Sequence, residues 1–333
     1  MANPVLVEVT RGDIVESRHR GAVAVVDGDG ATVLAIGDVK QPVFPRSAVK
    51  AIQALPLVES GAADRYCFSD ADIALACASH AGEPEQVSRA AAMLARAGLD
   101  ETSLECGSHW PSAEEASRVL ARDGRQPDQL HNNCSGKHSG FLCTCVHEGV
   151  AHGGYVERSH RVQQWVAEAM EAVTGAEHGE GNAAIDGCSI PTYAVPISSL
   201  ALGFARMATG RNLPPQRAAA ARRILAACMA EPFEVSGTGR ADTRYMEQGG
   251  GRVFVKTGAE GVYCAALPEL ALGIALKCDD GNSRASEAMV AAIIARLLDK
   301  DELGERFAAF ARTPVLTRKG AVVGEIRPAG ELA

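Results

Sequence analysis

Short apolar runs of strand length lie at the two ends of this chain, and helical periodicity fills the part between them. Near the start, the runs 22–26 and 32–36 flank Asp-Gly pairs, a pattern typical of a β-hairpin. Similar runs return late, at 253–255, 262–267 and 270–276. Strands at both ends with helices between them favour one sheet assembled from both termini. The sequence therefore predicts an α+β fold with helices packed on that sheet.

Helix signals are clear in the middle of the chain. Pro84 suits the first position of a helix and Gly98 suits its end, with apolar residues three and four apart between them. Periodicity of the same kind predicts helices at 47–58, 84–98, 113–122, 136–148, 156–173, 215–229 and 283–298.

We expect the whole chain, 1–333, to form one unit. Its sheet region is expected from 1–45 and 250–333, and its mainly helical region from 46–249. A cleft between sheet and helices is where a small-molecule site is expected.

Charge and hydropathy exclude several classes of partner. The net charge is −8, with 33 Lys and Arg against 41 Asp and Glu, whereas binding nucleic acid requires clustered cations. No apolar run reaches the length of a membrane span, and residues 1–10 lack the pattern of a secretory signal. We therefore expect no nucleic-acid or membrane partner and a cytoplasmic location. In that reducing compartment most of the ten cysteines should be free thiols.

A Ser-x-x-Lys pattern opens the predicted helix 47–58. Ser47 and Lys50 are three residues apart and therefore share one helix face. A lysine can accept the proton of a serine nucleophile only when it is neutral, a state that burial and a second positive charge both favour. The start of the helix also offers N–H groups to a developing oxyanion. The alternative is a chance pattern in which Ser47 only caps the helix.

Lys256-Thr257-Gly258 follows the predicted strand 253–255. Penicillin-recognising enzymes combine Ser-x-x-Lys on a helix with Lys-Thr-Gly on a late strand, and both patterns occur here in that order. The alternative is that Lys256 is an exposed strand residue beside a glycine-rich turn.

Ser79 and His80 lie in a loop of small residues before the Pro84 helix. A serine at such a place can relay protons between two lysines, although a turn residue is the commoner use. His80 could also act as the base of a Ser–His pair, but no third group that would orient it is evident.

Two further polar segments could hold a metal or a ligand. Cys134, Lys137 or His138, and the distant Cys188 would offer two thiolates and a nitrogen, a donor set that suits zinc. Two structural thiols in tight loops are the alternative. A phosphate loop is excluded, because the Walker pattern needs glycine where His131 stands. Asp186 could orient a ligand's ammonium group or simply form an Asp-Gly turn.

Taken together, these segments resemble the rhizobial-type L-asparaginases, also called class 3 or the asparaginase II family. The resemblance spans most of the chain and rests on the segments PRSAVKAIQALP (45–56), CASHAGEP (77–84), HNNCSGKHSGFL (131–142), DGCSIPTYAVP (186–196) and FVKTGAEGVYCAALP (254–268).

The resemblance implies a fold like that of serine β-lactamases and serine-dependent glutaminases, and a homodimer. It implies two serine–lysine tandems and a metal site that holds zinc near the active site, supporting it rather than performing the chemistry. By resemblance, the tandems are Ser47 with Lys50 and Ser79 with Lys256, the zinc ligands are Cys134, Lys137 and Cys188, and the residues lining the substrate pocket are Arg46, His138 and Asp186.

The function expected from this resemblance is hydrolysis of L-asparagine to L-aspartate and ammonia through an acyl-enzyme on Ser47. A serine-dependent glutaminase or another penicillin-recognising type of serine hydrolase is the nearest alternative. A non-catalytic sensor of zinc or amino acids is another, although such a protein has no need for two tandems. The choice between asparagine and glutamine stays open, because one methylene is worth only about 1–3 kcal/mol.

Overall fold

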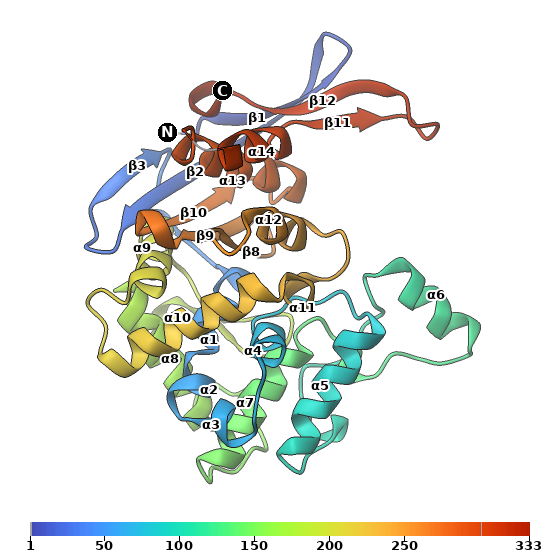
Figure 1. Cartoon of the computed structure of the whole chain (residues 1–333), viewed down its shortest axis with the longest axis vertical. Helices are drawn as coiled ribbons and strands as arrows, with labels where there is room; N and C mark the ends of the chain where they lie inside the picture. Colours follow the sequence, from blue (N-terminus) through green and yellow to red (C-terminus); the bar gives the residue numbers. More distant parts are fainter. Residues whose placement is uncertain (1, 301) are drawn as a thin grey trace.

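The computed structural model describes residues 2–300 and 302–333, and within them an eight-stranded antiparallel sheet forms the upper part of Figure 1. The strand order is β11-β12-β1-β2-β10-β9-β8, and β3 pairs with β2. The predicted α+β fold, with its sheet built from both chain ends, is confirmed. The strands are β1 (Val5–Arg11), β2 (Ile14–Asp27), β3 (Thr32–Ile36), β8 (Phe254–Thr257), β9 (Val262–Leu267), β10 (Leu272–Cys278), β11 (Thr313–Leu316) and β12 (Val322–Pro328).

The helices occupy most of the lower part of Figure 1, and α13 and α14 lie against the sheet. One small sheet joins the middle of the chain to its first part by pairing β4 (Pro42–Val43) with β7 (Val195–Pro196). A second lies within the middle of the chain and pairs β5 (Ala183–Ile185) with β6 (Pro191–Tyr193). The α-helices are α1 (Lys50–Gln53), α2 (Leu55–Glu59), α3 (Ala62–Arg65), α4 (Asp70–Ala76), α5 (Pro84–Arg96), α6 (Glu114–Arg122), α7 (Ser135–His147), α8 (Arg161–Thr174), α9 (Ile197–Thr209), α10 (Pro215–Ala230), α11 (Pro232–Ser236), α12 (Ala241–Gly249), α13 (Ser283–Leu297) and α14 (Glu302–Phe310).

Two of the predicted helices differ from the structure. The stretch 47–58 is not one helix: a 3-10 turn, η1 (Arg46–Val49), precedes α1, and α2 follows after Ala54. Pro56 explains this break, because it has no N–H to continue the hydrogen bonds of α1. The helix predicted from residue 156 begins only at Arg161, where the His160 side chain accepts a hydrogen bond from the N–H of Val162.

The central strands are covered on both faces by helices. Gly273 and Cys278 of β10 are five residues apart and therefore face opposite sides of the sheet. Gly273 lies against α9, whereas Gly21, the partner of Cys278 in β2, lies against Met289 of α13. Burial on both faces explains why residues 22–26 form a continuous apolar run instead of alternating with polar ones.

Replacing Gly273 with alanine is expected to lower the free energy of unfolding by about 3 kcal/mol or more. An added Cβ would lie 2.0 Å from the carbonyl oxygen of Ala201 and 2.3 Å from the N of Ala205, both in the α9 backbone. Helix and strand would have to separate. Urea denaturation measures the loss, with Gly153→Ala as the control, because an added Cβ at Gly153 meets nothing within 4 Å. Equal stability of the two variants would contradict this packing.

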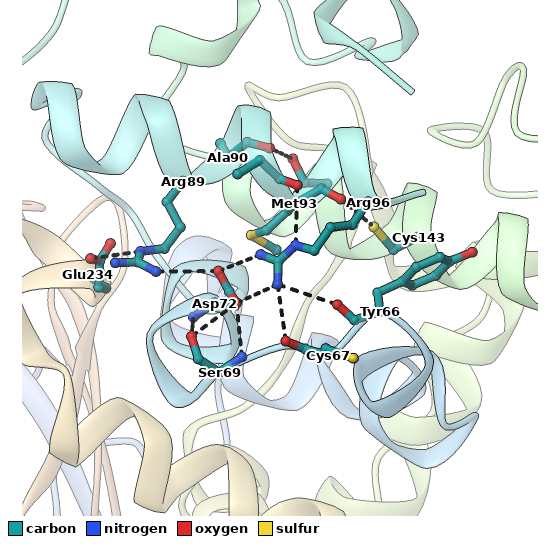
Figure 2. Close-up of polar contacts among 12 residues, drawn as sticks. Tyr66, Cys67, Ser69, Asp72, Arg89, Ala90, Met93, Arg96, Cys143 and Glu234 are labelled. Atoms are coloured by element: carbon teal, nitrogen blue, oxygen red, sulfur yellow. Dashed lines mark hydrogen bonds and ion pairs between the residues drawn. The ribbon is translucent and has the colours of Figure 1, made fainter. Parts of the chain in front are cut away.

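A buried carboxylate ties together the helices that lead to the loop of Ser79. Asp72 of α4 accepts bonds from Arg96 of α5, at 2.9 and 2.8 Å, and from the N–H of Ser69 (Figure 2). Arg89 links this carboxylate to Glu234 of α11, at 3.4 and 2.9 Å. Burial alone would raise the pKa of Asp72. The bonds from Arg96 and Ser69 lower it by more than burial raises it, so the net shift is downward. This network holds α4, and with it the following loop, against α5 and α11.

Among the described residues, no helix combines the length and the apolar character needed to cross a lipid bilayer.

Candidate active site

Three lysines from distant parts of the chain are buried close together. Lys50 begins α1, Lys137 lies in the first turn of α7 and Lys256 lies on β8, and each is at most 2% exposed. Burial is the largest cause that lowers the pKa of Lys50; the sulfur of Cys134 raises it, but the charges of Lys137 and Lys256 oppose this effect and the net shift is downward. Burying an amine is costly, and clusters of this kind mark functional sites.

Lys50 has the surroundings of a general base. Its Nζ donates to the carbonyl of Ala78 at 2.5 Å, to Ser79 Oγ at 3.0 Å and to Cys134 Sγ at 3.1 Å. Ser79 follows α4 and is held by a bond from its backbone N–H to Val235. No carboxylate among the residues that the structure describes pairs with Lys50. A buried amine without such a partner is readily neutral, the form that accepts a proton.

Ser47 lies in the η1 turn, directly against the Lys-Thr-Gly segment. A Cβ added to Gly258 would lie 2.4 Å from the carbonyl oxygen of Pro45, which explains why this position needs glycine. Arg46, just before the serine, has φ of 52°, a strained value for a residue with a side chain. Ser47 is half-buried, and its hydroxyl makes no hydrogen bond within residues 2–300 and 302–333. The Nζ of Lys50 donates its hydrogen bond to the hydroxyl of Ser79 and not to that of Ser47.

Lys256 is paired with Asp242, a residue that the sequence analysis missed. Its Nζ lies 3.1 Å from Asp242 Oδ2, and both side chains are 0% exposed. Asp242 also accepts bonds from the N–H of Thr257 and from the hydroxyl of Tyr263. The structure thus brings Ser79 to Lys50 and Lys256 to Asp242, where the resemblance implied Ser79 with Lys256. An aspartate at the start of a short helix carries no sequence signal for this role.

Cys134, Lys137 and Cys188 come together as the resemblance implied. Lys137 Nζ lies 3.2 Å from Cys188 Sγ, and Lys50 Nζ lies 3.1 Å from Cys134 Sγ. The mutual influence of the two thiols lowers the pKa of Cys134 well below its usual value and raises the pKa of Cys188. Burial lowers the pKa of Lys137, but the two sulfurs more than offset it and the net shift is upward. Two sulfurs and an amine in one buried cluster offer three donor atoms to a metal such as zinc, and each must lose its proton to bind it.

The three residues expected to line the substrate pocket differ in position. Arg46 Nε lies 2.6 Å from Asp186 Oδ1, and the Arg46 side chain is 30% exposed. Burial raises the pKa of Asp186, but Lys137 and Arg46 lower it more, so the net shift is downward. His138 is fully buried, with Nδ1 2.7 Å from the hydroxyl of Tyr155. Its Nε2 is buried without a hydrogen-bond partner, as expected of an atom that a bound group would satisfy.

His80 is not placed to act as the base of a Ser–His pair. Its Nδ1 accepts a bond from the N–H of Gly82, so Nε2 carries the proton and donates to Ser135 Oγ at 2.8 Å. Burial, reinforced by the charge of Lys50, lowers the pKa of His80 to about 3. The ring is therefore neutral and holds the loop of Ser79 to the start of α7.

Stability should fall as the solution is acidified, because His80 resists protonation in the folded state. The unfolded chain binds a proton at this histidine below about pH 6.5, whereas the folded protein does so only near pH 3, so the contribution is lost between these values. At pH 4.5 the loss is about 3 kcal/mol. Urea denaturation at pH 7 and pH 4.5 should show a smaller difference for His80→Gln than for the parent. His152→Gln is the control. If the free energy of unfolding changed equally between pH 7 and pH 4.5 in both variants, the assignment to His80 would be contradicted.

Comparisons with known proteins identify the family of this chain. The chain matches the L-asparaginase II family over residues 7–328. Similar solved structures include Mglu in its glutamate form, 17% identical with a TM-score of 0.45, covering 85% of this chain and 61% of that one. A second Mglu structure is 16% identical with a TM-score of 0.47, covering 90% and 72%. A beta-lactamase from Mycobacterium bovis is 15% identical with a TM-score of 0.40, covering 83% and 94%.

The chain thus spans about three fifths of the first of these structures. No curated protein matches the chain by sequence. The family match nevertheless runs almost from end to end and includes every residue of the buried lysine cluster. The chain belongs to the L-asparaginase II family.

Proposed function

We propose that this protein is an amidohydrolase, a rhizobial-type L-asparaginase that hydrolyses L-asparagine to L-aspartate and ammonia through a serine acyl-enzyme. The observation that carries the proposal is the buried amine of Lys50. It is bonded to Ser79, has no carboxylate partner in the described chain, and belongs to the same turn as Ser47. An amidase needs a base of this kind beside a serine that nothing else engages.

In the proposed reaction, Ser47 Oγ attacks the side-chain amide carbon of asparagine while Lys50 accepts its proton. Backbone N–H groups of the η1 turn, including that of Ser47, stabilise the oxyanion. The Lys50–Ser79 hydrogen bond offers a route for the proton to the departing ammonia. Lys256, held by Asp242, supplies a fixed positive charge nearby. Water then hydrolyses the β-aspartyl ester, and aspartate leaves with Ser47 restored.

The Arg46–Asp186 pair is suited to the ends of an amino acid. A guanidinium group binds an α-carboxylate in a bidentate manner, and a carboxylate binds an α-ammonium group. Because Arg46 and Asp186 are already paired at 2.6 Å, an amino acid can exchange one ion pair for two at little electrostatic cost. The short side chain of asparagine would bring its amide to Ser47.

Cys134, Lys137 and Cys188 are the residues that would hold zinc. When bound, zinc would supply a positive charge that keeps both sulfurs deprotonated and fixes the loop before α7 to the turn 186–190. The cysteines of this chain are free thiols, a state that a reducing cytoplasm maintains. We place the enzyme there as a homodimer, which light scattering in solution would show as twice the mass of the chain.

Ammonia release from L-asparagine and L-glutamine, measured side by side with the purified protein, tests the proposal. Faster turnover of asparagine supports it, and faster turnover of glutamine would make the protein a serine-dependent glutaminase with the same site. Hydrolysis of nitrocefin without release of ammonia would assign it to the penicillin-recognising hydrolases. If the protein, supplied with zinc, released ammonia from neither amino acid and left nitrocefin intact, the proposed function would be wrong.

A further inference from the structure

A second cluster of metal-binding side chains lies outside the candidate active site. His19 of β2, Cys278 at the end of β10 and Asp280 in the turn before α13 place one ligand atom each within 4.8 Å of one another. His19 Nδ1 is 2.6 Å from Asp280 Oδ2, and Cys278 Sγ is 3.0 Å from Asp280 Oδ1. Oδ1 also accepts the N–H of Asn282 at 3.1 Å. None of these bonds involves a residue of the candidate active site.

The surroundings of the cluster favour a cation. His19 and Cys278 are buried, whereas the Asp280 side chain is 49% exposed and opens the cluster to solvent. Among the described ion pairs, none joins Asp280 to a lysine or arginine, so no fixed cation occupies its carboxylate. The neighbouring Asp279 is engaged elsewhere, because its Oδ1 accepts a hydrogen bond from the Asn3 side chain. The nearest lysine along the chain, Lys277, bonds the backbone carbonyl of Cys278 at 2.7 Å and, within the described residues, leaves the three ligand atoms free of a lysine or arginine bond. An incoming metal ion can therefore reach the cluster from the exposed side of Asp280.

We propose that His19, Cys278 and Asp280 form a binding site for a divalent transition metal of the zinc class. An imidazole, a thiolate and a carboxylate are ligands that zinc accepts, whereas magnesium and calcium prefer oxygen alone. Three protein ligands leave a fourth, tetrahedral position, which water can occupy on the exposed side of Asp280. The metal would join the end of the β2–β10 pair to the start of α13.

The proton balance of binding sets the expected affinity. Burial, with the nearby Asp280, raises the pKa of Cys278 to about 12, so binding releases the thiol proton to solvent as the sulfur–metal bond forms. The imidazole proton must move from Nδ1, which faces Asp280, to Nε2, which is buried without a hydrogen-bond partner. Metal-binding histidines usually have such a partner, and losing it weakens binding by about 10- to 100-fold. We therefore expect an exchangeable site, weaker than a structural zinc site.

Cobalt absorption in the full-length chain tests the site, because thiolate ligands give Co²⁺ a charge-transfer band. The double variant Cys134→Ser/Cys188→Ser removes both sulfurs of the other candidate site, so any remaining thiolate band must come from elsewhere. We expect about one Co²⁺ per chain with such a band, displaced by Zn²⁺. Adding Cys278→Ser should abolish the band, and adding Asp280→Asn should weaken binding by at least about tenfold. Asp279→Asn is the matched control and should bind as its parent does.

Zinc content provides a second measurement that leaves Cys134 and Cys188 intact. After dialysis against micromolar zinc, the parent should hold about two ions per chain and Asp280→Asn about one. Ammonia release should stay the same in Asp280→Asn, so a failed asparaginase assay would not affect this test. The proposal would be overturned by a zinc content that Asp280→Asn leaves unchanged, or by equal losses in Asp279→Asn and Asp280→Asn.

Discussion

Replacing Ser47 with alanine is expected to lower the rate of ammonia release from L-asparagine by at least about 10⁴-fold. In the proposed reaction its Oγ forms the bond to the substrate, and no other group of the η1 turn can replace it. The hydroxyl makes no hydrogen bond in the described chain and is only half-buried, so the free energy of unfolding should change by less than about 0.5 kcal/mol. Activity and stability should therefore separate in this variant.

Two further serine variants sharpen that experiment. Ser79→Ala removes the partner of Lys50 but not the nucleophile, so a smaller loss of about 10²- to 10³-fold is expected. Ser60→Ala lies away from the lysine cluster, and its hydroxyl bonds only within its own turn, so it should retain full activity. Steady-state ammonia release and urea denaturation measure both quantities. A folded Ser47→Ala protein with more than about a tenth of the parent rate would rule out this serine as the nucleophile.

Replacing Asp242 with asparagine is expected to lower the free energy of unfolding by about 3–5 kcal/mol, the largest stability effect that we predict. The asparagine side chain keeps the shape of the aspartate and can still accept from Thr257 or Tyr263, so the variant removes mainly charge. Lys256 would then be left in a fully buried place without a counter-ion. Such a charge costs far more than the loss of an exposed ion pair.

A double variant and an exposed pair serve as controls for this effect. Removing both charges, in Asp242→Asn/Lys256→Met, should recover most of the lost stability, because no unpaired charge remains. Asp64→Asn breaks the ion pair with Arg223 on the surface, where the Asp64 side chain is 68% exposed, and should cost less than about 1 kcal/mol. If Asp242→Asn were no less stable than Asp64→Asn, the buried pair would not exist as described.

Much of the fold could be predicted from local patterns. The β-hairpin runs, the late strands and helices such as α5, with proline at its start, follow from periodicity and from residues that begin or end an element. The helix α9 was missed, because its sequence is apolar on most sides and shows little periodicity. Its position explains this: α9 lies between β10 and other helices, and a helix that is covered all round needs no polar face.

In the candidate site, too, some features could be predicted from the sequence and others could not. The residue types that carry chemistry were evident in sequence, because Ser-x-x-Lys, Lys-Thr-Gly and the two polar cysteine segments are short and local. Their partners were not, since Lys50 meets Ser79 and Cys134, and Lys256 meets Asp242, across separations of 14 to 84 residues. Sequence by itself determined which groups this protein can bring to a reaction. Only the tertiary structure decided which of them share protons, because a buried charge is stabilised by whichever group packing places within about 3 Å of it.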